Sequence, residues 1–175
     1  AMKTVEKAKL SSNVSSETER QSIYDIEIND IKGNPMSLAA YKEKKILFVN
    51  VASKCGFTKQ YKELQQLSDT YKDQLVIIGS PCNQFGKQEP GDALQIQEFC
   101  AINFGVTFPL TEKLDVKGKN QHPLYTWLTS KKLNGKKRSS VKWNFQKYIV
   151  DENGELLNYH YSLTKPMSSK ITKYF

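Results

Sequence analysis

The 175-residue chain has few of the residues that cross-link or metallate small proteins: three cysteines, two histidines and no Cys-x-x-Cys pair. Secreted scaffolds that depend on disulfides carry many more cysteines, usually in an even number. Two histidines and three scattered cysteines do not supply the ligand clusters of a structural zinc site. The sequence therefore predicts neither a metal nor a disulfide framework. It favours a reducing intracellular compartment, the cytoplasm first and an organelle if a targeting segment has been removed.

Long apolar runs are also missing, because no stretch reaches the roughly 18 apolar residues of a transmembrane helix. Hydrophobic residues still make up 38% and aromatic residues 11% of the chain, which suits one folded domain. The start of the chain is different, since it is rich in Ser, Glu and Lys and offers almost nothing to bury. We expect a disordered leader over residues 1–21 and a single domain over residues 22–175.

Hydrophobic patterning in the first half of this domain predicts strands separated by a helix. Apolar and polar residues alternate over Tyr24–Asn29, which indicates a strand. Lys45–Val51 and Gln74–Gly79 are short, mostly apolar runs typical of strands buried on both faces. Between them, Lys59–Tyr71 places Tyr and Leu residues at three- and four-residue spacing, as in an amphipathic helix. A strand, helix and strand of this length form a parallel crossover unit.

The second half predicts a further mixture of elements. We expect a helix from the capping residue Asp92 to about Phe104, a helix near His122–Lys131, a strand over Trp143–Val150, a turn at Asn153–Gly154, a returning antiparallel strand over Glu155–Tyr161 and a closing helix over Pro166–Tyr174. The whole order predicts an α/β, thioredoxin-like fold, with a mixed central sheet flanked by helices.

Cys55 is the first candidate for chemistry, because it follows a buried strand and precedes a predicted helix. Free N–H groups at a helix start and the charge of Lys54 both favour the thiolate form of such a cysteine. Gly56 leaves room for a substrate beside the sulfur. The alternative is a small apolar residue that merely ends a strand.

Amide and indole groups occur in two further segments. The loop that follows the second buried strand carries Asn83, Gln84 and Gln88, and Trp143 and Asn144 stand together near the predicted fourth strand. Such N–H donors stabilise a thiolate and bind a peroxide oxygen as charge develops on it. Taken alone, the loop is an ordinary polar loop and the tryptophan an ordinary core residue.

Three segments, NVASKCGFT, PCNQFGKQEPG and KWNFQKYIVD, resemble the motifs of the glutathione peroxidase family in order and spacing. The resemblance implies a thioredoxin fold, no cofactor, and reduction of hydrogen peroxide and of organic or lipid hydroperoxides. It places Cys55 at the position of the peroxidatic selenocysteine or cysteine. Gln88, Trp143 and Asn144 fall on the other members of the catalytic tetrad.

Cys100 lies 45 residues after Cys55, in EFCAINFGVTFP. This segment resembles the resolving-cysteine segment of the selenium-free, thioredoxin-dependent branch of the family. The resemblance implies a Cys55 sulfenic acid, then a Cys55–Cys100 disulfide, then reduction by thioredoxin or a related dithiol protein. Two alternatives remain: a one-cysteine peroxidase that uses glutathione directly, and a peroxide sensor that passes its disulfide to a regulatory protein. We expect Cys82 to be structural.

The net charge of +8 has a local source. Seven basic residues and no acidic one lie between Lys131 and Lys147, next to Trp143. This region predicts a docking surface for an acidic protein reductant or for anionic lipid head groups, or else a solvated face. We expect no nucleic-acid binding, because no aromatic-interleaved basic motif accompanies the charge. The segment from about Lys113 to Val141 is as short as in monomeric members of the family, so we expect a monomer.

Overall fold

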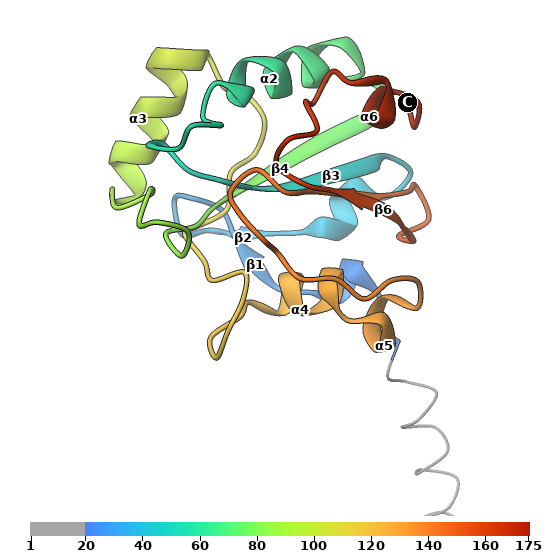
Figure 1. Cartoon of the computed structure of the whole chain (residues 1–175). Helices are drawn as coiled ribbons and strands as arrows, with labels where there is room; N and C mark the ends of the chain where they lie inside the picture. Colours follow the sequence, from blue (N-terminus) through green and yellow to red (C-terminus); the bar gives the residue numbers. More distant parts are fainter. Residues whose placement is uncertain (1–19) are drawn as a thin grey trace, which may run out of the picture.

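The structure, a computed structural model, describes residues 20–175 (Figure 1). The predicted leader therefore lies outside the described residues, apart from its last two positions. At one of these, the Gln21 carbonyl accepts a hydrogen bond from Trp127 Nε1 at 2.6 Å, and the Gln21 N–H donates to the Leu133 carbonyl at 3.1 Å. The chain is thus tied to the body of the domain from Gln21 onward.

A four-stranded mixed sheet forms the centre of the domain, with the strand order β4-β3-β5-β6. Its strands are β3 (Lys45–Val51), β4 (Leu75–Pro81), β5 (Lys147–Val150) and β6 (Leu156–His160). β3 runs parallel to β4 and antiparallel to β5, and β5 runs antiparallel to β6. The predicted crossover unit and the thioredoxin-like mixed sheet are confirmed. β4 extends two residues beyond its predicted end.

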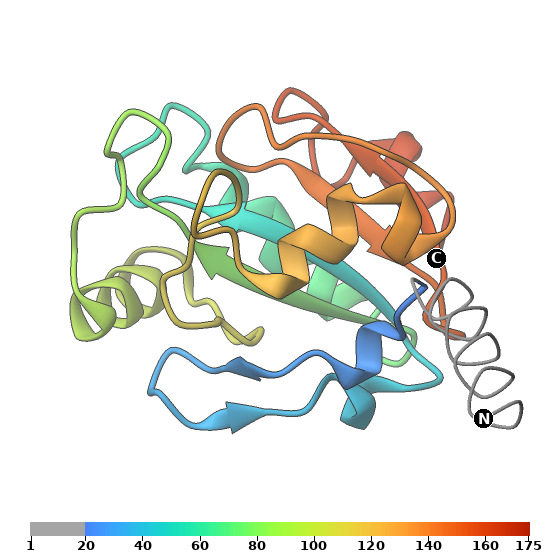
Figure 2. The ribbon, with the colours of Figure 1, turned by 90° about the horizontal axis from the view of Figure 1, so that it is seen from below.

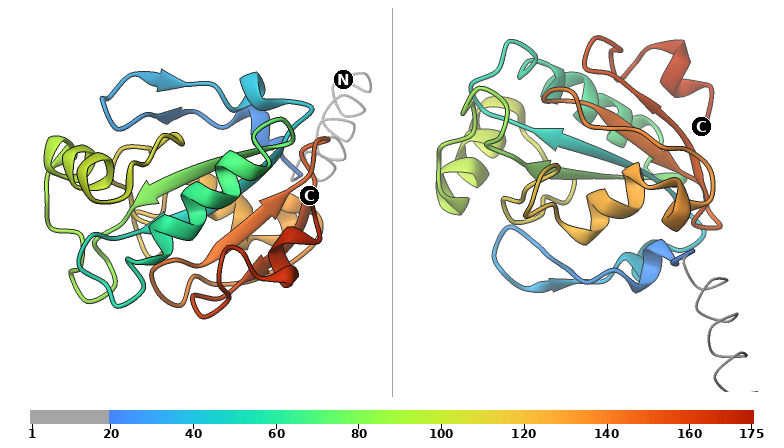
Figure 3. Two further views of the ribbon diagram at one scale, coloured as in Figure 1. Left: turned by 90° about the horizontal axis from the view of Figure 1, so that it is seen from above. Right: turned by 60° about the horizontal axis from the view of Figure 1, so that its bottom comes forward.

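Helices cover both faces of this sheet. They are α2 (Gln60–Thr70), α3 (Ala93–Phe104), α4 (Pro123–Thr129), α5 (Lys131–Asn134) and α6 (Ser169–Thr172). In Figure 1, α2, α3 and α6 lie above the sheet, and α4 and α5 lie below it. Viewed from above, α2 crosses over β3 and β4 (Figure 3, left). None of the helices in residues 20–175 is both long and apolar enough to cross a membrane.

Alternation along the central strands divides the interior into two cores. Ile46 and Phe48 of β3 point into the lower core, where they join Trp127 of α4. Leu47 and Val49 point into the upper core, beneath α2 and α3. Each core packs against one face of the sheet, so loops at the end of the sheet can contact both cores.

The strand predicted over Tyr24–Asn29 is wrong in its first half. A 3₁₀ turn, η1 (Ile23–Asp25), stands there, and β1 (Ile28–Asn29) is only two residues long and pairs with β2 (Pro35–Met36). Ser22 explains the difference, because its Oγ accepts the Tyr24 N–H at 3.3 Å and caps the turn. A second 3₁₀ turn, η2 (Leu38–Tyr41), leads into the sheet.

The helix predicted near His122–Lys131 is two helices. Ser130 takes an extended conformation between α4 and α5, and the backbone turns there. His122 itself caps α4, since its Nδ1 accepts the Leu124 N–H at 3.1 Å. The closing helix is shorter than predicted and is limited to α6.

Candidate active site

Three loops meet at one end of the sheet: the loop after β3, the loop after β4 and the loop before β5 (Figure 2). Topology explains the meeting. β3 and β4 are parallel, so their carboxyl ends lie together, and antiparallel β5 starts at that same end. Ligands of open α/β sheets bind beyond the carboxyl ends of parallel strands. The first loop carries Cys55, the second Gln88, and the third Trp143 and Asn144.

Cys55 sits in a tight, half-buried turn. Its N–H donates to Thr58 Oγ1 at 2.9 Å, and the Thr58 hydroxyl donates to the Ala52 carbonyl at 2.8 Å. The Phe57 N–H donates to the Cys55 sulfur at 3.3 Å. The predicted helix start is displaced, because α2 begins at Gln60, and the donor to the sulfur is this turn amide instead. The sulfur thus accepts a hydrogen bond from the backbone of its own turn.

Gln88 and Asn144 are hydrogen-bonded to each other. Asn144, which is fully buried, donates from Nδ2 to Gln88 Oε1 at 3.0 Å and to the Phe85 carbonyl at 3.4 Å. Because the Gln88 oxygen is engaged, its NH₂ group is the end left to face a ligand. The Trp143 ring packs on the Phe85 ring with centroids 5.7 Å apart.

Gly86 shows how close Gln88 and Trp143 lie. A Cβ atom at this glycine would stand 3.3 Å from both Gln88 Nε2 and Trp143 Cη2, and its φ of +67° disfavours other residues. The Gly86 backbone therefore lies so close to Gln88 and Trp143 that a side chain at this position would displace them.

Hydrogen bonds join the Cys55 loop to the loop after β4, and the end of β3 to the loop before β5. The Lys54 N–H donates to the Gln88 carbonyl at 3.0 Å. Asn50, at the end of β3, donates from Nδ2 to the Trp143 carbonyl at 3.1 Å and accepts the Phe145 N–H. The structure thus brings the four predicted residues of the tetrad to one end of the sheet.

The strand predicted from Trp143 is wrong in its first half, because β5 begins only at Lys147. Phe145 has φ +64°, a left-handed conformation that interrupts the strand. Trp143 and Asn144 therefore stand on a loop, where their side chains reach across the sheet end. Alternation of apolar residues gives no signal for a left-handed residue.

The prediction that Lys147 belongs to the basic surface is wrong, because its side chain is completely buried. Its Nζ donates to Gln60 Oε1 and the Thr164 carbonyl, both at 2.6 Å, and to the Ser162 carbonyl at 3.2 Å. Burial lowers the pKa of Lys147 to about 7, with the charge of Glu63 opposing the shift. The lysine holds a loop whose Ser162 hydroxyl donates to the Asn144 carbonyl. It supports the site from inside the protein.

Cys100 lies on α3 with a free, buried thiol. Asp92 and Gln95 close a capping box at the start of this helix, as the predicted cap requires. Burial raises the pKa of Cys100 to about 11; the neighbouring Tyr61 hydroxyl opposes the shift and the charge of Glu89 adds to it. Cys55 packs against the upper core, to which Cys100 belongs, so both sulfurs border one apolar layer.

Cys82 is buried in the lower core, on the other side of the sheet. Its thiol donates to Gln84 Oε1 at 3.5 Å, and burial raises its pKa. This position agrees with the structural role that we expected for it.

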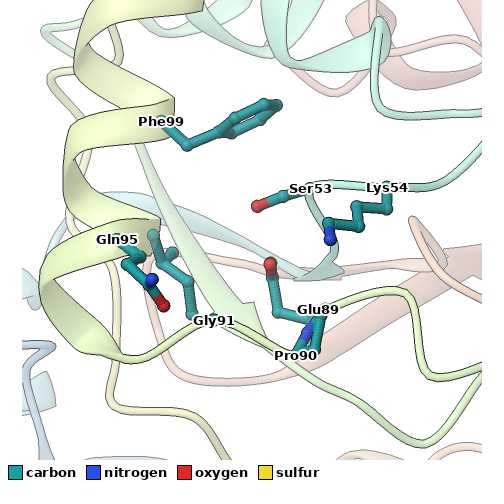
Figure 4. A pocket seen from close by; sticks show the side chains of 8 residues that line it. Ser53, Lys54, Glu89, Pro90, Gly91, Gln95 and Phe99 are labelled. Carbon is teal, nitrogen blue, oxygen red and sulfur yellow. The ribbon is translucent and has the colours of Figure 1, made fainter.

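A pocket of about 390 Å³ separates the Cys55 loop from α3 (Figure 4). It is lined by Ser53, Lys54, Glu89, Pro90, Gly91, Gln95, Ile96 and Phe99. Within residues 20–175, no three His, Cys, Asp or Glu side chains cluster as metal ligands would.

A half-buried cysteine in a turn, with a glutamine, a tryptophan and an asparagine at the same end of a thioredoxin-like sheet, fits the class of thiol peroxidases. Residues 23–129 match the family model of glutathione peroxidase. The chain is 52% identical over 148 residues to glutathione peroxidase-like peroxiredoxin 2 of Saccharomyces cerevisiae, covering 84% of this chain and 91% of the relative. The protein belongs to the glutathione peroxidase family, and it is a peroxidase.

Solved structures agree. The crystal structure of Trgpx in its apo form is 37% identical, with a TM-score of 0.68 over 87% of this chain and 94% of that chain. A thioredoxin-family thiol:disulfide interchange protein from Chlorobium tepidum matches with a TM-score of 0.62 over 89% of this chain and 95% of that chain. At 14% identity, the second match shows the shared thioredoxin-like fold alone.

Proposed function

We propose that the protein reduces hydrogen peroxide and organic or lipid hydroperoxides by a two-cysteine cycle. The Cys55 thiolate attacks the O–O bond, its sulfur becomes a sulfenic acid, and water or an alcohol leaves. The observation that carries this proposal is the Phe57 N–H on the Cys55 sulfur, joined through Lys54 to the Gln88–Asn144 pair. In this cycle, Gln88 and Trp143 donate N–H groups to the developing oxygen charge, and Asn144 orients Gln88.

Cys100 then resolves the sulfenic acid by forming a disulfide with Cys55. A disulfide needs Cα atoms within about 7 Å and suitably directed side chains. Because Cys100 is buried on an intact helix, the cycle that we propose includes an opening of α3 in each turnover. The helix is suited to this, because Ile96 and Cys100 are its only fully buried side chains. Segments with few buried apolar contacts open at low free-energy cost.

A dithiol protein of the thioredoxin type then restores both thiols by exchange. The exposed residues of the basic region, Lys131, Lys132, Lys136, Lys137, Arg138 and Lys142, form the surface that we assign to an acidic reductant. Long-range attraction between such a surface and an acidic partner raises the association rate and weakens with salt. A vesicle of anionic lipid that competes with the reductant would instead assign this surface to membranes.

We also propose that the protein works as a monomer in the reducing cytoplasm. The segment around α4 and α5 is compact and packs on its own sheet, as Figure 2 shows. Sedimentation at micromolar concentration tests the first statement. Microscopy of a tagged protein tests the second.

One observation favours a second candidate, a one-cysteine peroxidase reduced by glutathione. The pKa of Cys100 is about 11, so in the closed protein this thiol is unreactive at neutral pH. Steady-state turnover with thioredoxin and with glutathione, measured on the same preparation, separates the two candidates.

Mass spectrometry of peroxide-treated protein tests the two-cysteine cycle directly. We expect a Cys55–Cys100 link and the loss of two hydrogens. Amide exchange across residues 92–104 should rise in the oxidised protein, because α3 has opened. A Cys55–Cys82 link would show that Cys100 is not the partner of Cys55. Unchanged amide exchange across residues 92–104 would contradict the opening of α3.

A further inference from the structure

Glu89 is a buried carboxylate that the proposed cycle does not yet use. It follows Gln88 in the loop after β4, and its side chain is 1% exposed. Its backbone is fixed, because the Glu89 N–H donates to Asn83 Oδ1 at 3.0 Å. Its two carboxylate oxygens are buried, and the hydroxyl and backbone N–H of Ser53 are the hydrogen-bonding groups beside them. Burying a carboxylate beside so few donors still costs free energy, which suggests that Glu89 has a role in the site.

The carboxylate lies between the segments that carry the two sulfurs. One wall of its pocket is Ser53 and Lys54, immediately before Cys55. The other wall is on α3, where Ile96 and Phe99 stand one turn and one residue before Cys100. Figure 4 shows the Glu89 oxygen pointing away from its own loop, toward Ser53 and Lys54, with α3 across the pocket.

The electrostatics of this group suit proton transfer. Burial raises the pKa of Glu89, while Ser53 and the charge of Lys113 oppose the shift. The Glu89 charge in turn raises the pKa of both Cys100 and Tyr61, so it lies within electrostatic reach of the thiol. A base with a raised pKa accepts a proton more effectively near neutral pH than an exposed carboxylate.

We propose that Glu89 accepts the proton of Cys100 as the disulfide closes and passes it to the hydroxyl that leaves Cys55. This inference rests on the two-cysteine cycle proposed above. The Cys100 S–H bond breaks, its electron pair forms the S–S bond, and the Cys55 S–O bond breaks. The released hydroxide takes the proton from Glu89 and leaves as water. The Cys100 sulfur is oxidised, the sulfenic sulfur is reduced, and Glu89 ends ionised as it began.

A purely electrostatic role makes the opposite prediction. If Glu89 only held Cys100 protonated, removing its charge would lower the pKa of Cys100 and speed the closing of the disulfide. If Glu89 takes the proton, removing its basicity slows that step. The sign of the change therefore decides between the two roles.

The experiment is a single turnover of reduced protein with one equivalent of hydrogen peroxide, quenched at set times and analysed by mass spectrometry. In Glu89→Gln, we expect disulfide closing to slow by roughly 10- to 100-fold, and by a larger factor than sulfenic acid formation. Glu89→Asp should recover part of the rate. Glu98→Gln replaces an exposed acid on α3, the helix that carries Cys100; it is the matched control and should change neither step.

The pH profile of closing is the second readout. Lys54, Lys113, Tyr61 and Cys100 are the titratable groups that face Glu89 across the pocket and the upper core. In the wild type, the rate of disulfide formation should rise with pH as Glu89 ionises. This rise should be absent from the pH profile of Glu89→Gln. Closing as fast as or faster than the wild type would overturn the assignment. A wild type that never forms the Cys55–Cys100 link would instead overturn the two-cysteine cycle itself.

Discussion

The segments that carry Cys55 and Cys100 are held in place by different forces. The Cys55 loop is tied to the loop after β4 through Lys54, and β3, which leads into it, is tied to the loop before β5 through Asn50. The helix of Cys100 is capped at its start but contributes few fully buried side chains to the upper core. Hydrogen bonds to fixed partners preserve a geometry, whereas a thin apolar contact releases at low cost. The contacts of the Cys55 segment suit a fixed geometry, and those of α3 suit the opening that the proposed cycle includes.

The two sulfurs differ in the same sense. Cys55 is half-buried and its sulfur accepts an N–H, while Cys100 is buried, which raises its pKa to about 11. In the proposed cycle, Cys55 is therefore the sulfur that peroxide oxidises first. Cys100 then acts as the second nucleophile, once it has given its proton to a base that we infer to be Glu89.

Replacing Cys55 should have the largest effect. In Cys55→Ser, the hydroxyl offers no accessible anion near neutral pH, so peroxide consumption should fall by about 1,000-fold or more. Circular dichroism should remain that of the wild type, because the turn is held by the backbone and Thr58. Retained turnover in a folded variant would mean that the nucleophile lies elsewhere.

Cys100→Ser should stop the cycle one step later. We expect this variant to consume about one equivalent of peroxide and then stall with thioredoxin, because a dithiol reductase acts on a disulfide that the variant cannot form. Cys82→Ser is the matched control, since it also replaces a buried thiol, and it should turn over nearly normally. Undiminished thioredoxin-driven turnover in Cys100→Ser would show that Cys100 does not resolve the sulfenic acid, and the two segments would then not divide the cycle between them.

Asn144→Ala tests whether the hydrogen bonds around the Cys55 segment serve the reaction with peroxide. Loss of the bond to Gln88 should slow sulfenic acid formation by on the order of 100-fold, while reduction of the disulfide changes much less. Stopped-flow measurement of each half-reaction gives this split, and the exposed Asn120→Ala is the control. Equal slowing of both half-reactions would indicate a folding defect instead.

The elements with strong local signals were predictable from the sequence. Continuous apolar runs with helical spacing between them define β3, α2 and β4 to within one or two residues. The start of α3 was predictable too, because Asp92 is a strong cap. The motifs of Cys55 and Gln88 then fall at the ends of these strands, so their proximity follows from the parallel topology.

Features that depend on distant contacts were not predictable. The left-handed Phe145 ends a pattern that reads as a longer strand, and its N–H bonds to the distant Asn50. Lys147 reads as a surface charge because its three acceptors lie on two other segments. Glu89 reads as an ordinary loop acid until its burial is known.

The last and smallest effect concerns Lys147, which holds the loop whose Ser162 hydroxyl bonds the Asn144 carbonyl. The pKa of Lys147 is about 7 in the folded protein against an ordinary value of 10.5. Between these values the unfolded chain holds a proton that the folded protein has released, so this group makes stability rise with pH. The free energy of unfolding should rise by at most about 1.4 kcal/mol per pH unit between about pH 7 and pH 10, and this rise should be absent below pH 7.

Lys147→Met should remove this contribution. Urea unfolding at pH 7, 8 and 9, with thiols kept reduced, should show the stability difference between wild type and variant growing by about 1 kcal/mol per pH unit. The variant also leaves Gln60 Oε1 and two carbonyls without their donor, so it should be less stable already at pH 7. A difference independent of pH would show that Lys147 stays charged in the folded protein. The buried amine would then stabilise the Asn144 side of the site as a permanent cation, by charge-assisted hydrogen bonds alone.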